Sequence, residues 1–525
     1  MNRRRLLRQA VALGFASAIS TRGFMQAFAD TVAPPGSQDD WKDAFHAALA
    51  RDPSLVGWLG AQQDELSSGP LRVTGRIPEA LYGTLYRNGP ARHEIGAFRY
   101  HHWFDGDGMV QAFRLGADGA SHQGRFVATT KYKQEHAAGR ALFVAFGTTP
   151  PNARPVNSPD SINPANISML AHSGRLYALW EAGSPYEINP DDLSTMGAKA
   201  YSPETAGVPF SAHPRIEPDG TLWNFGYLSG ADTIVLWHID AGGKLVKTGL
   251  VKADGITMIH DCIVTERSLV LLIPPFVFKP DSGATFLDMH HWQPDKPTRA
   301  LVVDKNDFSK YRWYELPPQW VFHFANAWEA DGVIHFDAAR APDASAVYGS
   351  LRSVMRGERA QPGESHATHY AYQIDTRSGR VRESSVLDGL SSEFPSVDPR
   401  ITGQRHRQTF MLAAAEGTGS TLNTVARLHL NSGDREQYRY AATEHVEEHI
   451  YVPDPQKPPE RGGWVLGTTL DYSAMRAGGA DSDSRKAFTR LNIFEAERLE
   501  AGPIAVVQLP YALPLGLHGK FVRRA

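Results

Sequence analysis

Four of the 21 histidines lie in similar local settings, each beside a short apolar run of the kind that forms strands. They are His213, His260, His323 and His518, and the gaps between them are 47, 63 and 195 residues. A four-stranded propeller blade takes about 40 to 50 residues, so the first two gaps fit roughly one blade each and the last fits about three. Because the innermost strands of all blades surround the central axis, four imidazoles from different blades can meet there.

Four imidazoles at one point would bind a metal ion. Neutral imidazole suits zinc, copper, iron or nickel. Four neutral ligands leave the charge of the metal uncompensated, so carboxylates are expected behind the rings, where they accept hydrogen bonds from the outer ring nitrogens and fix the tautomers. The candidates are Glu181, Glu393 and Glu448, each next to apolar or aromatic residues.

The elements that must position these residues are short strands. Runs of four to eight apolar or alternating residues lie between turn-forming residues, for example at 175–180, 222–227, 268–273 and 333–336. Asp219-Gly220 and Asp331-Gly332 are typical turn signals. No long helices alternate with these runs, so the pattern predicts an all-β fold and leaves a sandwich pair, a barrel and a propeller open.

The composition excludes several classes of protein. The 525 residues include 54 Lys and Arg against 57 Asp and Glu, a net charge of −3, so no basic excess would attract nucleic acid. Cys262 is the single cysteine, which rules out an internal disulfide framework and any thiolate zinc or iron–sulfur site. Cys262 itself is expected to be a small buried hydrophobic residue.

The N-terminus has the layout of an export signal. Arg3, Arg4 and Arg5 precede an apolar run over 10–19, and Ala27-Phe28-Ala29 is a cleavage signal. Residues 1–29 therefore predict a signal of the twin-arginine type and a periplasmic protein. Residues 30–68 are expected to form an N-terminal helical extension, because Trp41, Phe45 and Leu49 share helical spacing. Residues 69–525 are expected to form a single domain.

A series of segments resembles the carotenoid cleavage oxygenase family, which includes apocarotenoid and stilbene dioxygenases and the retinoid isomerohydrolase. The segments run in family order from about residue 69 to the C-terminus, and so many in order are highly specific. They include Tyr86-Arg87-Asn88-Gly89-Pro90, the runs 102–110 and 174–183, His213-Pro214, His260-Asp261, Glu393-Phe394-Pro395, Gly463-Trp464 and His518-Gly519.

The resemblance implies a seven-bladed β-propeller with loops and short helices capping the active-site end. It implies one non-haem iron(II) per chain, held by the four histidines, three of which are oriented by the three glutamates named above. The implied reaction uses O₂ to cleave a C=C bond of a carotenoid or apocarotenoid into two carbonyl products. Stilbene-cleaving members tend to carry Lys where this chain has Trp180, so a carotenoid-like substrate is favoured over a lignostilbene.

A polyene offers no hydrogen bonds, so its tunnel should be lined by apolar side chains. The expected contributors are Phe104, Ile167, Trp180, Phe322 and Trp328. Ile167 replaces a Thr that is common in the family and is expected to form an apolar wall near the metal. Segments 141–146 and 271–288 are apolar enough for a peripheral membrane contact through which a lipophilic substrate would enter.

Other histidines and other functions compete with this interpretation. The pairs His101-His102 and His290-His291, and His366 with His369, are expected to be structural or exposed. A stilbene-type dioxygenase or an isomerohydrolase could use the same iron site. A non-catalytic metal-binding propeller is the alternative from a different class.

Overall fold

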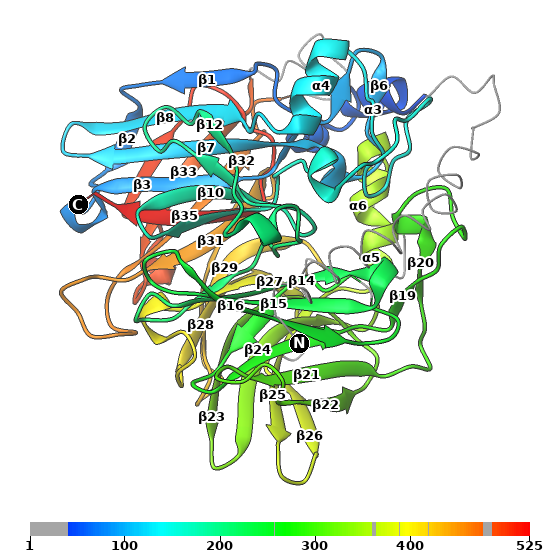
Figure 1. Cartoon of the computed structure of the whole chain (residues 1–525). Helices are drawn as coiled ribbons and strands as arrows, with labels where there is room; N and C mark the ends of the chain where they lie inside the picture. The colour runs from blue at the N-terminus through cyan, green and yellow to red at the C-terminus, as the bar shows by residue number, and fades with distance from the viewer. Residues whose placement is uncertain are drawn as a thin grey trace.

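The structure is a computed structural model that describes residues 40–256, 258–359, 364–387, 389–417, 419–475 and 486–524. The predicted signal segment 1–29 lies outside these residues. The described part of the chain contains seven antiparallel sheets of four to six strands, which are arranged as the blades of a β-propeller (Figure 1). This confirms the all-β, seven-bladed architecture and decides among the three all-β folds that the strand pattern left open.

Five of the seven sheets are meanders of four strands. From the inner strand outward, they are β9 (Ser168–His172), β10 (Arg175–Leu179), β11 (Tyr186–Ile188), β12 (Thr195–Ala198); β13 (Arg215–Ile216), β14 (Leu222–Leu228), β15 (Thr233–Ile239), β16 (Leu245–Lys252); β17 (Cys262–Val264), β18 (Ser268–Ile273), β21 (Thr298–Asp304), β22 (Tyr311–Leu316); β23 (Trp320–Ala330), β24 (Val333–Ala341), β25 (Thr368–Asp375), β26 (Val381–Ser385); and β27 (Ser392–Ser396), β28 (Gln408–Ala414), β29 (Leu422–His429), β30 (Arg435–Arg439).

The remaining two blades close the ring by joining the two ends of the described chain. One consists of β31 (Glu444–Val452), β32 (Trp464–Asp471), β33 (Phe488–Glu495), β34 (Ala505–Gln508) and the early strand β2 (Arg72–Gly75). The other places the late strand β35 (His518–Arg523) beside β3 (Gly83–Asn88), followed by β7 (Asp107–Gly116), β8 (Gly119–Phe126) and β1 (Glu65–Ser68), with β4 (Pro90–Arg92) also paired to β7. This closure carries His518 to the axis, where it is the first residue of β35.

The hydrophobic core is divided among the spaces between neighbouring blades. Strand β18 shows how: Leu269 and Leu271 pack against Leu236 of the preceding blade, whereas Val270 and Leu272 pack with Phe336 of the following one. Successive side chains of a strand point to opposite faces, and here both faces are covered. This explains why the sequence of β18 is a continuous apolar run and does not alternate.

The turn signals found in the sequence join adjacent strands of one blade. Asp331 and Gly332 connect β23 to β24 and have φ angles of 52° and 80°. Two consecutive positive φ angles are required by a two-residue hairpin turn whose twist matches that of the strands. Aspartate and glycine tolerate this conformation, so the dipeptide sets the pairing of β23 with β24 next to the turn, from Ala330 back to Ala327.

Helices and irregular segments gather at one end of the propeller, to the right in Figure 1. They include α3 (Trp41–Leu49), α4 (Thr130–Ala138), α5 (Ser345–Tyr348), α6 (Ser350–Ser353) and the small sheets β5 (Glu94–Ile95) with β6 (Phe98–Arg99) and β19 (Phe276–Phe278) with β20 (His290–Trp292). Helix α3 lies in the expected N-terminal extension. Strand β1, in contrast, precedes residue 69 and already pairs with β8, so sheet structure starts inside that extension.

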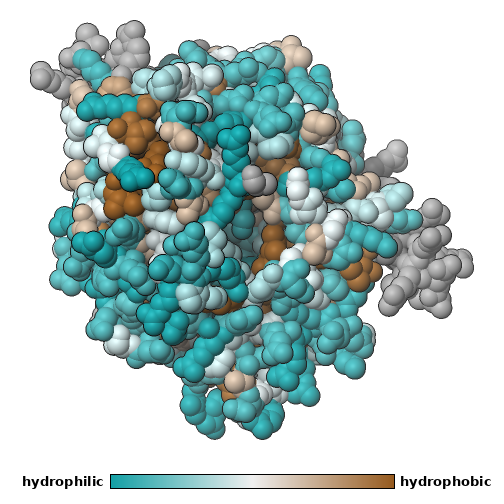
Figure 2. Space-filling view, turned by 90° about the vertical axis from the view of Figure 1, so that its left-hand side faces the viewer, coloured by the Kyte–Doolittle hydropathy of each residue, from teal (hydrophilic) through white to brown (hydrophobic). Residues whose placement is uncertain are grey.

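Few large hydrophobic residues are exposed on the surface of the described chain. The large hydrophobic residues that are exposed are Met196 (66%), Val246 (52%) and Tyr311 (40%). Figure 2, which shows the side at the left of Figure 1, has hydrophobic residues in a few small groups around a central hollow. Among the helices described, none has the length and apolar character needed to cross a bilayer.

Candidate metal centre

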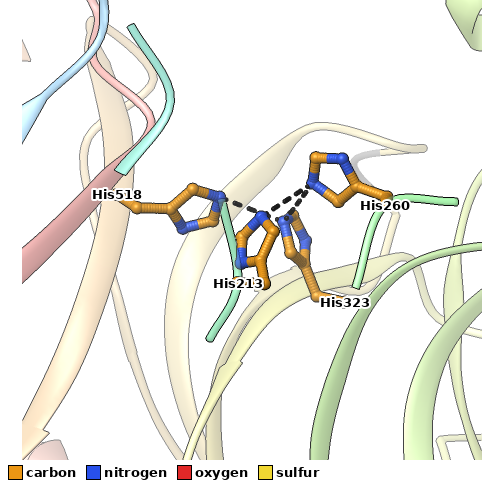
Figure 3. A group of neighbouring side chains, drawn as sticks. All are labelled: His213, His260, His323 and His518. Carbon is orange, nitrogen blue, oxygen red and sulfur yellow. Dashed lines mark hydrogen bonds between the residues drawn. The ribbon is translucent and has the colours of Figure 1, made fainter. Parts of the chain in front are cut away.

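The innermost strands of four blades bring the four histidines together. His213 and His260 each lie two residues before an inner strand, β13 and β17, while His323 lies within β23 and His518 begins β35. Their Nε2 atoms face one another: 3.0 Å separate His213 from His260, 3.3 Å His260 from His323, and 3.1 Å His323 from His518 (Figure 3). All four ligand atoms lie within 4.8 Å of one another.

Three carboxylates stand behind three of the rings. Glu181, just after β10, contacts Nδ1 of His260. Glu393 in β27 lies 2.6 Å from Nδ1 of His323, and Glu448 in β31 lies 2.8 Å from Nδ1 of His518. The structure thus brings together the three glutamates and the histidines that the sequence predicted, although the pairs are 70 or 79 residues apart in the chain.

These hydrogen bonds fix which ring nitrogen carries the proton. When its glutamate is ionised, the carboxylate only accepts hydrogen bonds, so Nδ1 of the paired histidine donates to it and Nε2 is left with a lone pair. Several lone pairs facing one point repel one another unless a cation lies between them. The arrangement therefore fits a metal ion bound by His213, His260, His323 and His518, with imidazole donors of the kind that iron, zinc, copper and nickel accept.

Burial keeps His213 and His323 in the neutral, ligating form. It lowers the pKa of His213 and of His323 well below the usual value, and the neighbouring histidines lower both further. The pKa of His260 is raised, because Glu181 outweighs the opposing effect of burial. Burial also raises the pKa of Glu393 to about 7, while His518 outweighs burial and holds the pKa of Glu448 below its usual value.

A cavity of about 1050 Å³ opens onto the centre and exposes His260, His323 and His518 to its interior. Its walls include Val144 and Phe146 from the segment after α4, and Phe278 and Phe286 from the segment around β19. Apolar side chains dominate the lining, as expected for a site that binds an apolar ligand. The capping segments of Figure 1 thus form part of the cavity that leads to the metal centre.

Four of the five predicted tunnel residues line this cavity: Phe104, Ile167, Trp180 and Phe322. Ile167 also contacts the metal centre, because its carbonyl accepts a hydrogen bond from the backbone N–H of His518 at 3.3 Å. The prediction for Trp328 requires correction. It is not among the residues that line the cavity, and its indole stacks on His335 with the ring centroids 3.8 Å apart.

Phe394 and Tyr227 also line the cavity and were not among the predicted tunnel residues. Phe394 follows Glu393, has a φ of 55° and stacks on His323 with the ring centroids 5.3 Å apart. A positive φ is uncommon for a bulky residue and marks a constrained site. Tyr227, on β14, lines the cavity beside Glu181, which raises the pKa of the tyrosine in addition to the larger effect of burial. In the sequence, Phe394 was visible only as part of the motif Glu393-Phe394-Pro395, and Tyr227 only as the last residue of the apolar run 222–227.

The competing histidines have other roles. His102 is buried and its Nε2 lies 3.0 Å from the carbonyl of Val347, while His290 is buried with its Nδ1 2.8 Å from the carbonyl of Phe286. His369 contacts Asp337, and His366 lines the cavity. Cys262 is buried, and burial raises the pKa of its thiol.

Comparison with known proteins identifies the class. The sequence profile of the RPE65 family, described as retinal pigment epithelial membrane protein, matches residues 60–523. The chain therefore belongs to the carotenoid cleavage oxygenase family, and it is an oxidoreductase of that type.

Individual relatives show the range of activities in this class. The chain is 32% identical to apocarotenoid-15,15′-oxygenase of Synechocystis sp., with 86% of this chain and 92% of the relative covered. It is 26% identical to isoeugenol monooxygenase of Pseudomonas nitroreducens, with 90% of this chain and 98% of the relative covered. A solved structure of cobalt-substituted Synechocystis apocarotenoid oxygenase matches this chain with a TM-score of 0.76 and 28% sequence identity. The match covers 90% of this chain and 98% of the solved one.

Proposed function

We propose that this protein is an iron(II)-dependent dioxygenase that cleaves a C=C bond of a carotenoid or apocarotenoid into two carbonyl compounds. The observation that carries the proposal is the convergence of four Nε2 atoms at the wall of a large apolar cavity. The 32% identity to an apocarotenoid oxygenase supports the substrate class.

The histidines, the glutamates and the aromatic cavity residues have different roles in the proposed reaction. Ferrous iron, when bound by the four histidines, supplies the electrons that allow O₂ to react with an alkene. The three glutamates hold protons on Nδ1 of their histidines, which keeps each Nε2 available to the metal. Phe104, Trp180 and Phe322 offer aromatic surface to a polyene and exclude water from the reacting bond.

The cavity gives reasons to prefer a carotenoid-like substrate to a phenolic one. Trp180 stands next to Glu181, where it provides no cation for a phenolic oxygen. Lys131 borders the cavity, but its ammonium is already bound to Glu135 at 2.7 Å and Asp107 at 3.0 Å. Both carboxylates are buried, so this lysine is held in the wall and does not reach toward a ligand.

The test combines metal analysis with oxygen labelling. The protein is prepared without metal, loaded with iron(II), and incubated under ¹⁸O₂ with an apocarotenal, with resveratrol and with isoeugenol in separate reactions. The proposal predicts near-stoichiometric iron and one labelled oxygen in each aldehyde fragment of the apocarotenal. Turnover of a phenolic substrate alone would replace the proposed substrate class, and a product without label would favour an isomerohydrolase. Metal uptake without any turnover would favour the non-catalytic propeller.

We also propose that the protein is exported to the periplasm and collects its substrate at a membrane. The basis for export is the twin-arginine pattern of residues 1–29. Phe146, Phe278 and Phe286, here called the cavity rim, are the basis for a membrane contact, since they pack together at the cavity. N-terminal sequencing of periplasmic protein tests the first idea, and liposome binding unchanged by Phe286→Asp would contradict the second.

A further inference from the structure

His213 is held differently from the other three histidines. Within the described residues, no carboxylate is paired with its ring, whereas His260, His323 and His518 each have a glutamate. Its backbone is held instead. The N–H of His213 donates to Oγ of Ser211 at 3.2 Å, and the carbonyl of His213 lies 3.6 Å from Sγ of Cys262, on the strand that follows His260.

Arg215, two residues after His213, ties this segment to two neighbouring strands. Its Nε donates to the carbonyl of Cys262 at 2.6 Å, and one terminal nitrogen donates to the carbonyl of Phe324 at 3.1 Å. Cys262 lies two residues after His260, and Phe324 directly follows His323. One guanidinium therefore joins three chain segments, each of which carries a histidine of the metal centre.

Asp261 completes the connection. Its side chain is 2% exposed, and its Oδ2 accepts hydrogen bonds from Arg215 at 2.5 Å and from the N–H of Phe324 at 2.9 Å. Its Oδ1 accepts from the N–H of Cys262 at 2.6 Å. The charge of Arg215 is thus balanced at the point where β17 and β23 approach each other.

The propeller architecture gives this pair its importance. Strands β13, β17 and β23 belong to three different sheets, so no ladder of backbone hydrogen bonds joins them. Strand β13 has only two residues, Arg215 and Ile216, and offers little support of its own. Pro214, between His213 and Arg215, has a restricted φ, so a displacement of the arginine is passed on to the histidine.

We propose that Arg215 and Asp261 are positioning residues that hold His213 at metal-binding distance from His260 and His323. The pair restrains the position of His213 through the backbone, whereas the glutamates hold the other three rings through Nδ1. This inference rests on the metal site put forward under the proposed function.

Three variants separate the roles of charge and geometry. Arg215→Met keeps much of the length of the side chain but removes every donor. Arg215→Lys keeps a charge for Asp261, yet a single ammonium lacks the planar fork that reaches both strands. In Arg215→Met with Asp261→Asn, no unpaired charge remains buried, so any loss of metal affinity reflects positioning. Arg400→Met is the matched control, because Arg400 also pairs with an aspartate, Asp398, and also donates to backbone carbonyls, including that of Lys457, but contacts no metal ligand.

The experiment titrates each metal-free protein with Co²⁺ and records the visible absorption bands, with Tm of the metal-free form measured in parallel. Arg215→Met and the double variant should bind Co²⁺ about 10- to 100-fold more weakly, with shifted bands. Arg215→Lys should lie between them and the wild type, and Arg400→Met should bind within about twofold of the wild type.

The outcomes are distinct. Unchanged affinity and bands in the Arg215→Met and double variants, with only Tm lowered, would overturn the proposal, and so would an equal loss of affinity in Arg400→Met. If Arg215→Met fails to fold, the double variant and Arg215→Lys decide by the same two readouts. A wild-type protein that binds no Co²⁺ would overturn the metal site itself, which is a different result from variants that match a metal-binding wild type.

Discussion

Two buried clusters of histidines and carboxylates contact strand β23, and they are arranged in opposite ways. In the axial centre the carboxylates lie outside and the Nε2 atoms face one another. In the second cluster the carboxylate of Asp337, on β24, lies in the middle. Nε2 of His369 donates to it at 2.7 Å, and Nε2 of His406 forms an ion pair with it at 2.9 Å.

The ring nitrogen that the carboxylate contacts decides whether a cluster can bind a metal ion. A glutamate on Nδ1 uses the proton there and leaves the lone pair of Nε2 free, so rings that converge create a place for a cation. An aspartate facing Nε2 uses that nitrogen directly, and the site is already neutralised. The Asp337 cluster therefore joins β24, β25 and the segment before β28 through an ion pair. Its Nε2 atoms already face the aspartate and do not converge on a position that a metal ion could occupy.

The largest expected difference is in metal content. His260→Ala should reduce bound iron from near one per chain to near zero and abolish turnover, because it removes a ligand in contact with two others. His406→Ala, a matched loss of a buried imidazole, should leave the iron content unchanged. Elemental analysis of both purified variants checks this, and equal iron loss in the two would end the distinction between the clusters.

The next difference separates stability from metal affinity. Asp337→Asn should lower the free energy of unfolding by about 3 to 5 kcal/mol, because it removes one partner of a fully buried ion pair. Glu393→Gln should instead weaken iron binding about 10- to 100-fold. Denaturant unfolding and competition with a chelator measure the two quantities. Reversed results would mean that the axial site is the structural cluster.

The sequence predicted one of these clusters and missed the other for a physical reason. The axial histidines roughly follow the blade period, and His213, His260 and His518 each occur in a motif that resembles the family. Asp337, His369 and His406 follow no common period, because their contacts cross from β24 to β25 within a blade and then to a loop of the next blade. Only the three-dimensional packing reveals them, although His369 was expected to be structural.

The same limit explains Trp328, Arg215 and Asp261. Trp328 was expected in the tunnel as an aromatic residue, but it does not line the cavity and stacks on His335 instead. The motifs containing Arg215 and Asp261 were visible in the sequence as neighbours of His213 and His260. That one guanidinium would join three blades depends on the angle between their inner strands, which local sequence does not encode.

A smaller effect concerns pH. Burial disfavours the charged form of His406, but Asp337 outweighs it and raises the pKa, so this contribution to stability is full below the ordinary pKa of 6.5 and is lost as pH rises through the folded-state pKa. The pKa of Asp337 is lowered, since His406 and His369 outweigh burial, so its contribution is present above the ordinary pKa of 3.8 and is lost as pH falls through the folded-state pKa. The difference in Tm between wild type and Asp337→Asn should therefore be larger at pH 6 than at pH 9. A constant difference would exclude an ion pair.

The smallest effect compares the two ends of β23. Phe322 lines the cavity and its ring meets His260 edge to face, with the centroids 5.0 Å apart, so Phe322→Leu should raise KM for an apocarotenal about two- to tenfold while iron content stays constant. Trp328→Leu removes the stacking on His335 and should cost about 0.5 to 1.5 kcal/mol of stability, with KM unchanged. Steady-state kinetics and denaturant unfolding of both variants decide the matter. An equal rise in KM for Trp328→Leu would mean that a change at the far end of β23 also affects substrate binding. The two ends of the strand would then not have separate roles.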